Sequence, residues 1–261
     1  MKQVLGRVLQ NEWVNERYKH MVVYAPEVAA ACMPGQFFHI RCDDQFTPLL
    51  RRPMSIYQYN ADYGEVHFLY SVKGNGTTLL AEKKIDDLVD LFGPLGKGFQ
   101  LDPHWRSILV VARGVGLATL APLTRLAAKH GIQTHAILSA RTAEDVLSRA
   151  YMEANGAYVN VVTDADGSSD MHHVEALLHN LIKETPIDAL FTCGSRRLTN
   201  LLRRVALEHK LPGQVALEEN MGCAIGMCFC CVKPFLKDGK QVNLRVCADG
   251  PVFDLQEVME A

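Results

Sequence analysis

Cysteines gather near the end of this chain, where five of the eight fall between residues 223 and 247. Four of them follow the spacing C-x4-C-x2-C and then a distant cysteine: Cys223, Cys228, Cys231 and Cys247. Two irons bridged by two sulfides need four thiolates, and this spacing is typical of plant-type [2Fe–2S] clusters. Gly222 and Gly226 have no Cβ, so the loop backbone can come close to such a cluster. The spacing therefore predicts a [2Fe–2S] site with these four ligands.

A zinc site and a disulfide framework are the alternatives for these cysteines. Zinc sites more typically have paired C-x2-C motifs, whereas here only Cys228 and Cys231 form such a pair. Disulfides are uncommon in a reducing compartment. Cys230 cannot easily face the cluster while Cys228 and Cys231 both do, so we expect it to be a bystander. Cys32 and Cys42 are expected to lie in the core.

Composition and charge limit the classes of function. The chain has 261 residues, 48% of them hydrophobic, and a net charge of -2 at pH 7. At the usual domain size of about 100–200 residues, this length predicts two domains plus a small module. The sequence has no basic stretch for nucleic acid, no run of roughly 18 apolar residues for a membrane helix, and no apolar signal region after Met1. We therefore expect a cytoplasmic protein that binds neither nucleic acid nor a membrane.

Residues 1–101 are predicted to form an antiparallel β-barrel. Short apolar or alternating runs recur there, separated by turn signals such as Pro34-Gly35 and Gly93-Pro94-Leu95-Gly96. Several short strands with turns at such intervals favour a small barrel or sandwich. The expected strands are residues 3–8, 20–24, 36–41, 53–59, 65–72 and 87–93.

Two motifs in this barrel together predict a site for a nucleotide diphosphate. In Arg51-Arg52-Pro53-Met54-Ser55, an arginine at a strand start can bind a diphosphate bidentately, and the serine can reach a flavin ring. In Lys73-Gly74-Asn75-Gly76-Thr77, a glycine-rich turn opens a helix whose free N–H groups favour a phosphate. Taken alone, the first is more simply a solvated arginine pair beside an edge-strand proline, and the second a turn capped by threonine.

Residues 102–214 change to alternating strands and helices. The strands are short and apolar, as in a buried parallel sheet, so the pattern predicts a doubly wound α/β domain. The expected strand and helix pairs are 107–112 with 117–130, 133–139 with 142–155, 158–163 with 172–183, and 188–193 with 196–209. Residues 215–261 remain as the small [2Fe–2S] module. His172 and His173, which begin the third helix, are expected on the surface.

Ligands of doubly wound sheets bind at the carboxyl ends of the strands. Three loops follow such ends here: Arg113-Gly114-Val115-Gly116, Asp164-Ala165-Asp166-Gly167-Ser168 and Cys193-Gly194-Ser195-Arg196-Arg197. The G-x-G turn is a weak signal by itself, but a strand before it and a helix after it are both predicted. The alternative is a tight strand–helix turn without a ligand.

In this order, the motifs resemble a known family. R-P-x-S, G-x-G-T, G-P-L-G, a nucleotide fold with C-G after a late strand, and Cys247-x-Asp249-Gly250-Pro251-Val252-Phe253 span essentially the whole chain. The chain is similar to the electron-transfer subunits of class B, NAD-linked dihydroorotate dehydrogenases, in the ferredoxin–NADP reductase superfamily. The resemblance implies an FAD-binding barrel, an NAD-binding domain and a [2Fe–2S] module. It also implies electron transfer between NAD(H), FAD, the cluster and the FMN of a separate catalytic subunit, usually in a heterotetramer.

The resemblance also implies the residues at each site. The cofactors carry the chemistry in such an oxidoreductase, so no catalytic side chain is expected, and NAD(H) is a diffusible substrate. Cys193 would lie near the nicotinamide in a positional role. FAD would be held by Arg52, Pro53, Met54, Ser55, Leu69, Tyr70, Ser71, Gly76 and Thr77, and NAD(H) by Gly114, Gly116, Cys193 and Gly194.

Two residues depart from the family pattern. Ser71 stands where the family often has a basic residue, and Arg113 where it usually has a run of glycines. Arg113 is expected at the edge of the nucleotide site, where it can contact or crowd a pyrophosphate. A paralogous reductase subunit for another flavoprotein, such as a ferredoxin:NAD(P) oxidoreductase or a hydrogenase-linked diaphorase, is therefore an alternative. A second alternative is a non-catalytic iron–sulfur sensor or scaffold.

Overall fold

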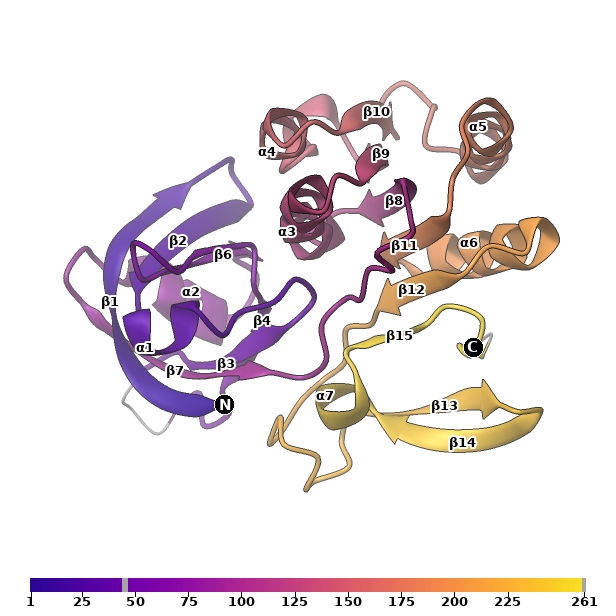
Figure 1. Ribbon diagram of the computed structural model, residues 1–261. Coiled ribbons are helices and arrows are strands. Elements are labelled where there is room, and N and C mark those ends of the chain that lie inside the picture. Colours follow the sequence, from indigo (N-terminus) through magenta and orange to yellow (C-terminus); the bar gives the residue numbers. More distant parts are fainter. Residues whose placement is uncertain (44–46, 260–261) are drawn as a thin grey trace. The chain divides into compact units, whose positions relative to one another are not determined.

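The computed structural model describes residues 1–43 and 47–259, which fold into two compact units (Figure 1). The first unit contains residues 1–98, 218–233 and 245–251. The second contains residues 99–217, 234–244 and the segment from 252 onward. The C-terminal part of the chain thus contributes to both units.

The first unit is built on a seven-stranded sheet with the order β4-β3-β7-β1-β2-β6-β5, in which all neighbours are antiparallel. This confirms the antiparallel barrel that the sequence predicts. Its strands are β1 (Lys2–Trp13), β2 (Tyr18–Tyr24), β3 (Phe37–Arg41), β4 (Arg52–Ser55), β5 (Gln58–Asn60), β6 (Glu65–Ser71) and β7 (Leu88–Leu95). The helices α1 (Pro26–Ala29) and α2 (Asn75–Glu82) belong to the same unit.

The strand expected over residues 53–59 is divided into β4 and β5, because the chain crosses there from one side of the sheet to the other. Ile56 donates its backbone N–H to Gln36, just before β3, at 3.0 Å. Tyr57 donates to His67 in β6 at 2.9 Å. These two bonds draw the β3 side toward β6 and curl the sheet.

The inside of this curled sheet holds the hydrophobic core. Phe38 and Phe68 are fully buried and pack edge to face, with ring centroids 5.7 Å apart, an arrangement that aromatic pairs favour. Cys32 and Cys42 are buried in the same cluster, which confirms their expected place in the core.

The second unit is built on a six-stranded sheet with the order β10-β9-β8-β11-β12-β15. Its neighbours are parallel except for the β12 and β15 pair. Figure 1 shows α3 and α4 on one side of this sheet and α5 and α6 on the other, as in a doubly wound fold. The strands are β8 (Ser107–Arg113), β9 (Gln133–Ala140), β10 (Tyr158–Thr163), β11 (Ala189–Cys193), β12 (Gly213–Ala216) and β15 (Val252–Asp254).

The helices of this unit follow the expected order with one correction. They are α3 (Gly116–Lys129), the 3-10 helix η1 (Ala143–Asp145), α4 (Arg149–Ala154), α5 (Met171–Glu184) and α6 (Arg196–His209). The single helix expected over residues 142–155 is wrong, because η1 and α4 are separated at Ser148. That residue has a φ of 70°, a left-handed backbone that interrupts a right-handed helix. His172 and His173 are exposed, as expected.

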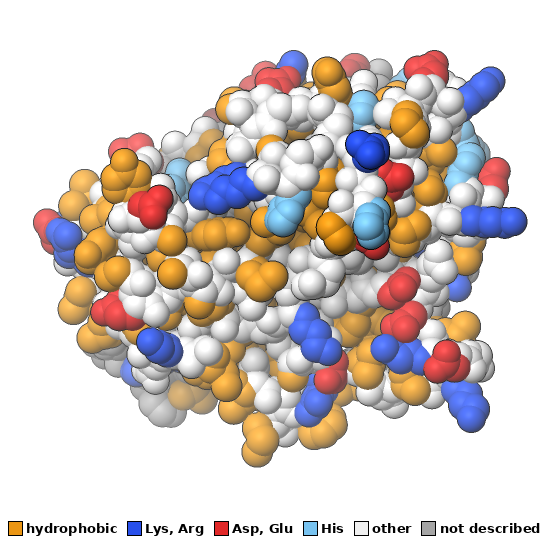
Figure 2. All heavy atoms as spheres, viewed as in Figure 1, with side chains coloured by type: hydrophobic (Ala, Val, Ile, Leu, Met, Phe, Trp, Pro, Cys, Tyr) orange, Lys and Arg blue, Asp and Glu red, His pale blue; other side chains and the backbone are white. Residues whose placement is uncertain are grey.

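Three elements complete the C-terminal part. β13 (Val232–Lys237) and β14 (Lys240–Arg245) pair in a two-stranded sheet, and α7 (Val246–Asp249) follows. No helix within the described ranges is long and apolar enough to span a bilayer. On the face drawn in Figure 2, acidic and basic side chains are interspersed over the described residues without an extended surface of one sign.

Candidate cofactor and nucleotide sites

The four predicted cluster ligands come together in the first unit. The sulfur of Cys223 accepts hydrogen bonds from the backbone N–H groups of Met227 at 3.2 Å and Cys228 at 3.4 Å. The backbone N–H of Cys247, in α7, is directed at the sulfur of Cys231 at 3.4 Å. The loop and the helix are also joined by Val246, which donates to the carbonyl of Cys231 at 3.0 Å.

Two glycines allow the loop to bend around these sulfurs, as the sequence predicts. A Cβ on Gly222 would lie 3.3 Å from the Cys228 sulfur. Gly226 has a φ of +82°, and a Cβ there would lie 3.0 Å from both the Ala248 Cβ and a guanidinium nitrogen of Arg245. Side chains at either position would push against the loop, so the backbone path depends on glycine.

An ion pair between Arg245 and Asp249, which the sequence analysis does not predict, holds this loop to α7. Arg245 makes a double contact with Asp249, Nε to Oδ2 at 2.9 Å and Nη2 to Oδ1 at 3.1 Å. Its Nη1 donates to the carbonyl of Gly226 at 3.3 Å. The bond from Arg245 holds the pKa of Asp249 below its usual range. The signal available in the sequence was the i,i+4 spacing of the two charges next to Cys247.

The protonation of the thiols fits a site for a bound cation. Burial opposes ionisation of Cys223, but hydrogen bonds from the backbone of Cys228, Ile225 and Met227 outweigh it and lower its pKa to about 6. Burial, followed by the hydrogen bond and charge of Cys231, raises the pKa of Cys247 to about 12. A thiol must lose its proton to bind a metal. The lowered pKa of Cys223 favours its thiolate, and Cys247 would release its proton when a metal binds. The donor set therefore fits an iron–sulfur cluster.

None of the eight cysteines, all of which lie in the described ranges, forms a disulfide. Cys228 and Cys230 are both exposed, whereas Cys231 and Cys247 are buried. Exposure therefore does not distinguish the expected bystander Cys230 from the expected ligand Cys228, and the role of Cys230 stays a prediction.

The two arginines of the R-R-P-x-S motif have separate environments. Arg51 pairs bidentately with Asp90 of β7, Nη1 to Oδ1 at 3.0 Å and Nη2 to Oδ2 at 2.5 Å. Both side chains are largely buried, at 21% and 11% exposed. Within the described part of the chain, Arg52 instead bonds to backbone carbonyls, those of Leu50 at 2.6 Å and Arg51 at 3.4 Å. Arg51 therefore stabilises the barrel, and Arg52 keeps its donors available for a ligand.

The G-x-G-T motif lies beside Arg52. A Cβ on Gly76 would lie 3.0 Å from the Arg52 Nε, so the two motifs meet, as predicted. Thr77 Oγ1 accepts from the backbone N–H groups of Lys73 at 3.0 Å and Gly74 at 3.1 Å, which orders the first turn of α2. A guanidinium beside a helix N-terminus fits the diphosphate of FAD.

The other residues expected at the FAD lie on β4 and β6. Pro53, Met54 and Ser55 are partly exposed on β4. Leu69 and Tyr70 are buried on β6, and Ser71 is partly exposed at its end. The Tyr70 hydroxyl donates to Asn11 at 2.9 Å, and burial raises its pKa. That hydroxyl is thus occupied within the barrel.

The nucleotide turn of the second unit packs tightly against β11. A Cβ on Gly116 would lie only 2.4 Å from the carbonyl oxygen of Cys193 and 3.2 Å from its sulfur. A Cβ on Gly194 would lie 3.3 Å from the backbone nitrogen of Arg113. The structure therefore brings Gly116, Cys193 and Gly194 together, while Gly114, with a φ of +60°, forms the turn.

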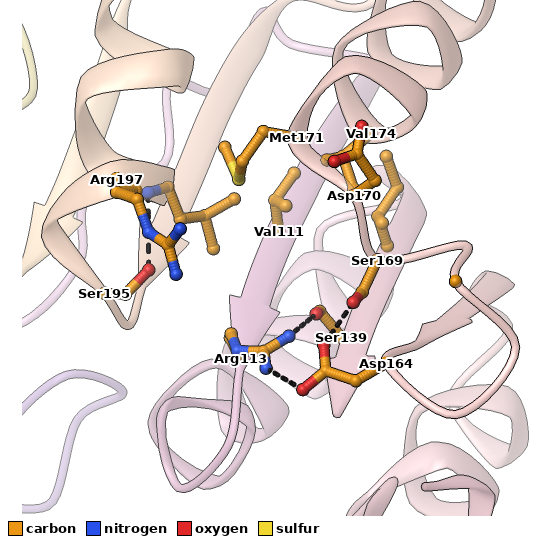
Figure 3. Close-up of a pocket in the computed structure, with 13 residues that line it drawn as sticks. Val111, Arg113, Ser139, Asp164, Ser169, Asp170, Met171, Val174, Ser195 and Arg197 are labelled. Carbon is orange, nitrogen blue, oxygen red and sulfur yellow. Dashed lines mark hydrogen bonds and ion pairs between the residues drawn. The ribbon is translucent and has the colours of Figure 1, made fainter. Parts of the chain in front are cut away.

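A cavity of about 300 Å³ opens at the strand ends of this sheet (Figure 3). Arg113 reaches across two of those ends, with Nη1 donating to Ser139 Oγ and Nη2 to Asp164 Oδ2, each at 2.7 Å. Ser195 and Arg197, at the start of α6, lie on the other side of the cavity (Figure 3). Arg113 thus lies at the edge of the predicted nucleotide site, and its partner Ser139 gave no signal in the sequence.

This fold is shared with reductases of known structure. The structure described as "Insights into flavin-based electron bifurcation via the NADH-dependent reduced ferredoxin-NADP oxidoreductase structure" matches 98% of this chain and 90% of that chain, with a TM-score of 0.84 and 26% identity. Ferredoxin-NADP+ reductase from Plasmodium falciparum matches 80% of this chain and 90% of its own, with a TM-score of 0.63 and 12% identity. Barrel, nucleotide sheet and cysteine loop therefore define a ferredoxin–NADP reductase-type oxidoreductase with an iron–sulfur module.

Comparisons by sequence are more specific. A family model described as "Iron-sulfur cluster binding domain of dihydroorotate dehydrogenase B" matches residues 218–259. Relatives named "Dihydroorotate dehydrogenase B (NAD(+)), electron transfer subunit" include one from Desulforamulus reducens, 33% identical over 97% of both chains, and one from Bacillus mycoides, 36% identical over 99% of this chain and 98% of its own. This chain belongs to the family of dihydroorotate dehydrogenase B electron transfer subunits.

Proposed function

We propose that this chain is an oxidoreductase subunit of pyrimidine biosynthesis. It moves electrons between NAD(H), FAD and a [2Fe–2S] cluster, to or from the FMN of a dihydroorotate dehydrogenase catalytic subunit. The observation that carries the proposal is the approach of three cysteines of the loop and Cys247 of α7 to one another, in a chain that matches electron transfer subunits over nearly their full length. FAD, when bound, supplies the conversion between two-electron and one-electron transfer.

The chain's own residues bind and orient these groups. Arg52 and the first turn of α2 hold the FAD diphosphate, together with the other predicted residues of β4 and β6. The turn at Gly114 and Gly116 and the loop at Cys193 and Gly194 receive NAD(H). The cluster ligands are Cys223, Cys228, Cys231 and Cys247. The close contact of Gly76 with Arg52 and of Gly116 with Cys193 supports these assignments.

The remaining parts of the proposal concern organisation and place. Residues 1–101 serve FAD, 102–214 serve NAD(H), and 215–261 serve the cluster. The partner is an FMN-containing catalytic subunit in a heterotetramer. The protein works in the cytoplasm, where the thiols that would hold the cluster persist because the compartment is reducing.

A second candidate is a reductase subunit that serves another flavoprotein. Two observations favour it: the 26% identity to the NADH-dependent reduced ferredoxin-NADP oxidoreductase structure over 98% of this chain, and Arg113 where the family usually has glycine. The pyridine nucleotide and FAD would act as above, and only the partner would differ.

Anaerobic purification with co-purifying partners separates the two candidates. The proposal expects an FMN-containing partner, and NADH formation from dihydroorotate and NAD+ that requires both subunits. Co-purification with a different flavoprotein, with no dihydroorotate activity, would favour the second candidate. A protein without flavin absorbance would leave only the sensor or scaffold alternative.

A further inference from the structure

Two helices of the second unit bring two histidines and a glutamate together, away from every site described above. His179 lies in the middle of α5, and Glu208 and His209 are the last two residues of α6. The two helices cover the same side of the six-stranded sheet (Figure 1). Each of the three residues offers one ligand atom, and these atoms all lie within 4.8 Å of one another. The cluster therefore joins two elements that are separate in the sequence.

The two histidine rings are spaced almost as two ligands of one ion are. His179 Nδ1 and His209 Nε2 lie 2.9 Å apart, so a hydrogen on one nitrogen bonds to the lone pair of the other. In a tetrahedral zinc site with Zn–N bonds of about 2.0–2.1 Å, two ligand nitrogens lie roughly 3.3 Å apart. A small rotation of either side chain therefore lets both nitrogens bind one ion, with their hydrogens on the other ring nitrogens.

A glutamate from each helix lies beside these rings. Glu208 Oε2 is 3.9 Å and Glu175 Oε1 is 4.0 Å from His179 Nε2. Glu175 is bound by Arg204 at 2.6 Å, whereas the Glu208 side chain is 59% exposed and can turn toward an ion. Glu175 stays where it can accept the Nε2–H of His179, and a metal-bound histidine almost always donates its other ring N–H in this way.

We propose that His179, Glu208 and His209 bind a zinc ion that joins α5 to α6. Two imidazoles and one carboxylate form a ligand set that zinc accepts, whereas Ca²⁺ and Mg²⁺ take oxygen ligands. Three protein ligands leave a fourth tetrahedral position, which a water molecule fills. The inference goes beyond the proposed electron transfer, because none of these residues is assigned to FAD, NAD(H) or the iron–sulfur cluster.

The test measures zinc bound to the iron-loaded protein, in which the cluster cysteines are occupied. The anaerobically purified protein is dialysed against increasing Zn²⁺, and metal per chain is determined by elemental analysis while the visible spectrum reports FAD and the cluster. We expect the unaltered protein to bind one more zinc ion per chain than His179→Ala. Loss of a residue that merely supports a ligand weakens metal binding about ten- to a hundredfold, so Glu208→Gln should weaken zinc binding at least as much.

His173→Ala is the matched control, because it removes a histidine from the same helix but not from the cluster. His173 is exposed, and its spacing from His179 places it on a different face of α5, so zinc binding should stay unchanged. Glu208→Gln tests the proposal even if His179→Ala fails to fold, since its side chain is mostly exposed. Excess Mg²⁺ should not displace the zinc, because Mg²⁺ prefers oxygen ligands.

The outcomes separate this inference from the proposed function. Equal zinc binding by the unaltered protein, His179→Ala and Glu208→Gln would overturn the zinc site and leave the electron transfer as proposed. Displacement of the zinc by Mg²⁺ would also overturn it, because the histidines would then contribute nothing. A protein that holds no flavin or iron, but binds zinc through these residues, would refute the proposed function and leave the zinc site standing.

Discussion

Four cysteines surround one predicted cluster, and a fifth in the same loop provides a built-in control. Replacing Cys223, Cys228, Cys231 or Cys247 with serine should each remove the iron, because each change deletes one of four thiolates. Cys230→Ser should keep it, since the Cys230 side chain cannot easily face the cluster while those of Cys228 and Cys231 both do. The measurement is iron per chain, with the visible spectrum of the anaerobically purified protein. Iron lost in Cys230→Ser and kept in any of the other four would mean that the ligands are misassigned.

Arg52 is the residue whose loss should affect FAD most directly. Arg52→Ala removes the guanidinium beside Gly76 and the first turn of α2. A hydrogen bond to a charged group contributes about 1.5–3 kcal/mol, so FAD affinity should fall about ten- to a hundredfold, measured by fluorescence as FAD is titrated into the apoflavoprotein. Arg7→Ala is the matched control, because Arg7 forms an exposed pair with Asp86 in the same unit. Equal affinity in the two variants would show that Arg52 only starts a strand.

At the scale of residues, the sequence indicates the candidate ligands but not the residues that hold those ligands in place. Cysteine spacing singles out the four candidate ligands because three of them lie close together along the chain, and their role as ligands stays a prediction. The pair of Arg245 and Asp249 was not predicted, although it holds that loop to α7. Nor was the contact of Arg113 with Ser139, since it joins residues on separate strands. Contacts of this kind depend on the fold and leave no local pattern.

The start of α3 is packed so tightly that a single added methyl group should destabilise the protein. In Gly116→Ala the new Cβ would lie 2.4 Å from the carbonyl oxygen of Cys193, so α3 or β11 must shift. Overpacking of this kind costs about 1–3 kcal/mol, and thermal unfolding should reveal the loss. Gly74→Ala is the control, because a Cβ there meets nothing within 4 Å. A fully stable Gly116→Ala protein would mean that the helix and strand are not packed as described.

At the scale of elements, periodicity and turn signals predicted most strands and helices. The failures lie where tertiary contacts outweigh local pattern. The predicted strand over residues 53–59 is broken because Ile56 and Tyr57 bond to different strands. β15 joins the nucleotide sheet antiparallel to β12, although it follows the last cluster cysteine by only a few residues. Pairing between segments that are distant along the chain cannot be seen in local pattern.

At the scale of the whole molecule, the C-terminal segment is divided between the two units, because the chain enters each unit more than once. The cluster loop belongs to the same unit as the barrel. Within this unit, the G-P-L-G turn of the barrel contacts the segment that follows Cys247. Lys97 donates its backbone N–H to the carbonyl of Gly250 at 2.5 Å. A Cβ on Gly96 would lie 2.4 Å from Pro251. The turn of the barrel therefore supports the segment that carries Cys247.

The proposed electron transfer has two steps, from NADH to FAD and from FAD through the cluster to the catalytic subunit. A cluster-deficient variant should separate these steps. The residues assigned to FAD and NAD(H) do not include Cys247, so Cys247→Ser should retain FAD and its bleaching by NADH. The same variant should fail to deliver electrons to the co-purified catalytic subunit, because the exit through the iron is gone. The loss of FAD absorbance after NADH is added measures the first step. NADH-dependent reduction of the partner's FMN measures the second step. Undiminished reduction of the partner by Cys247→Ser, with iron confirmed absent, would show that electrons leave the flavin without the cluster.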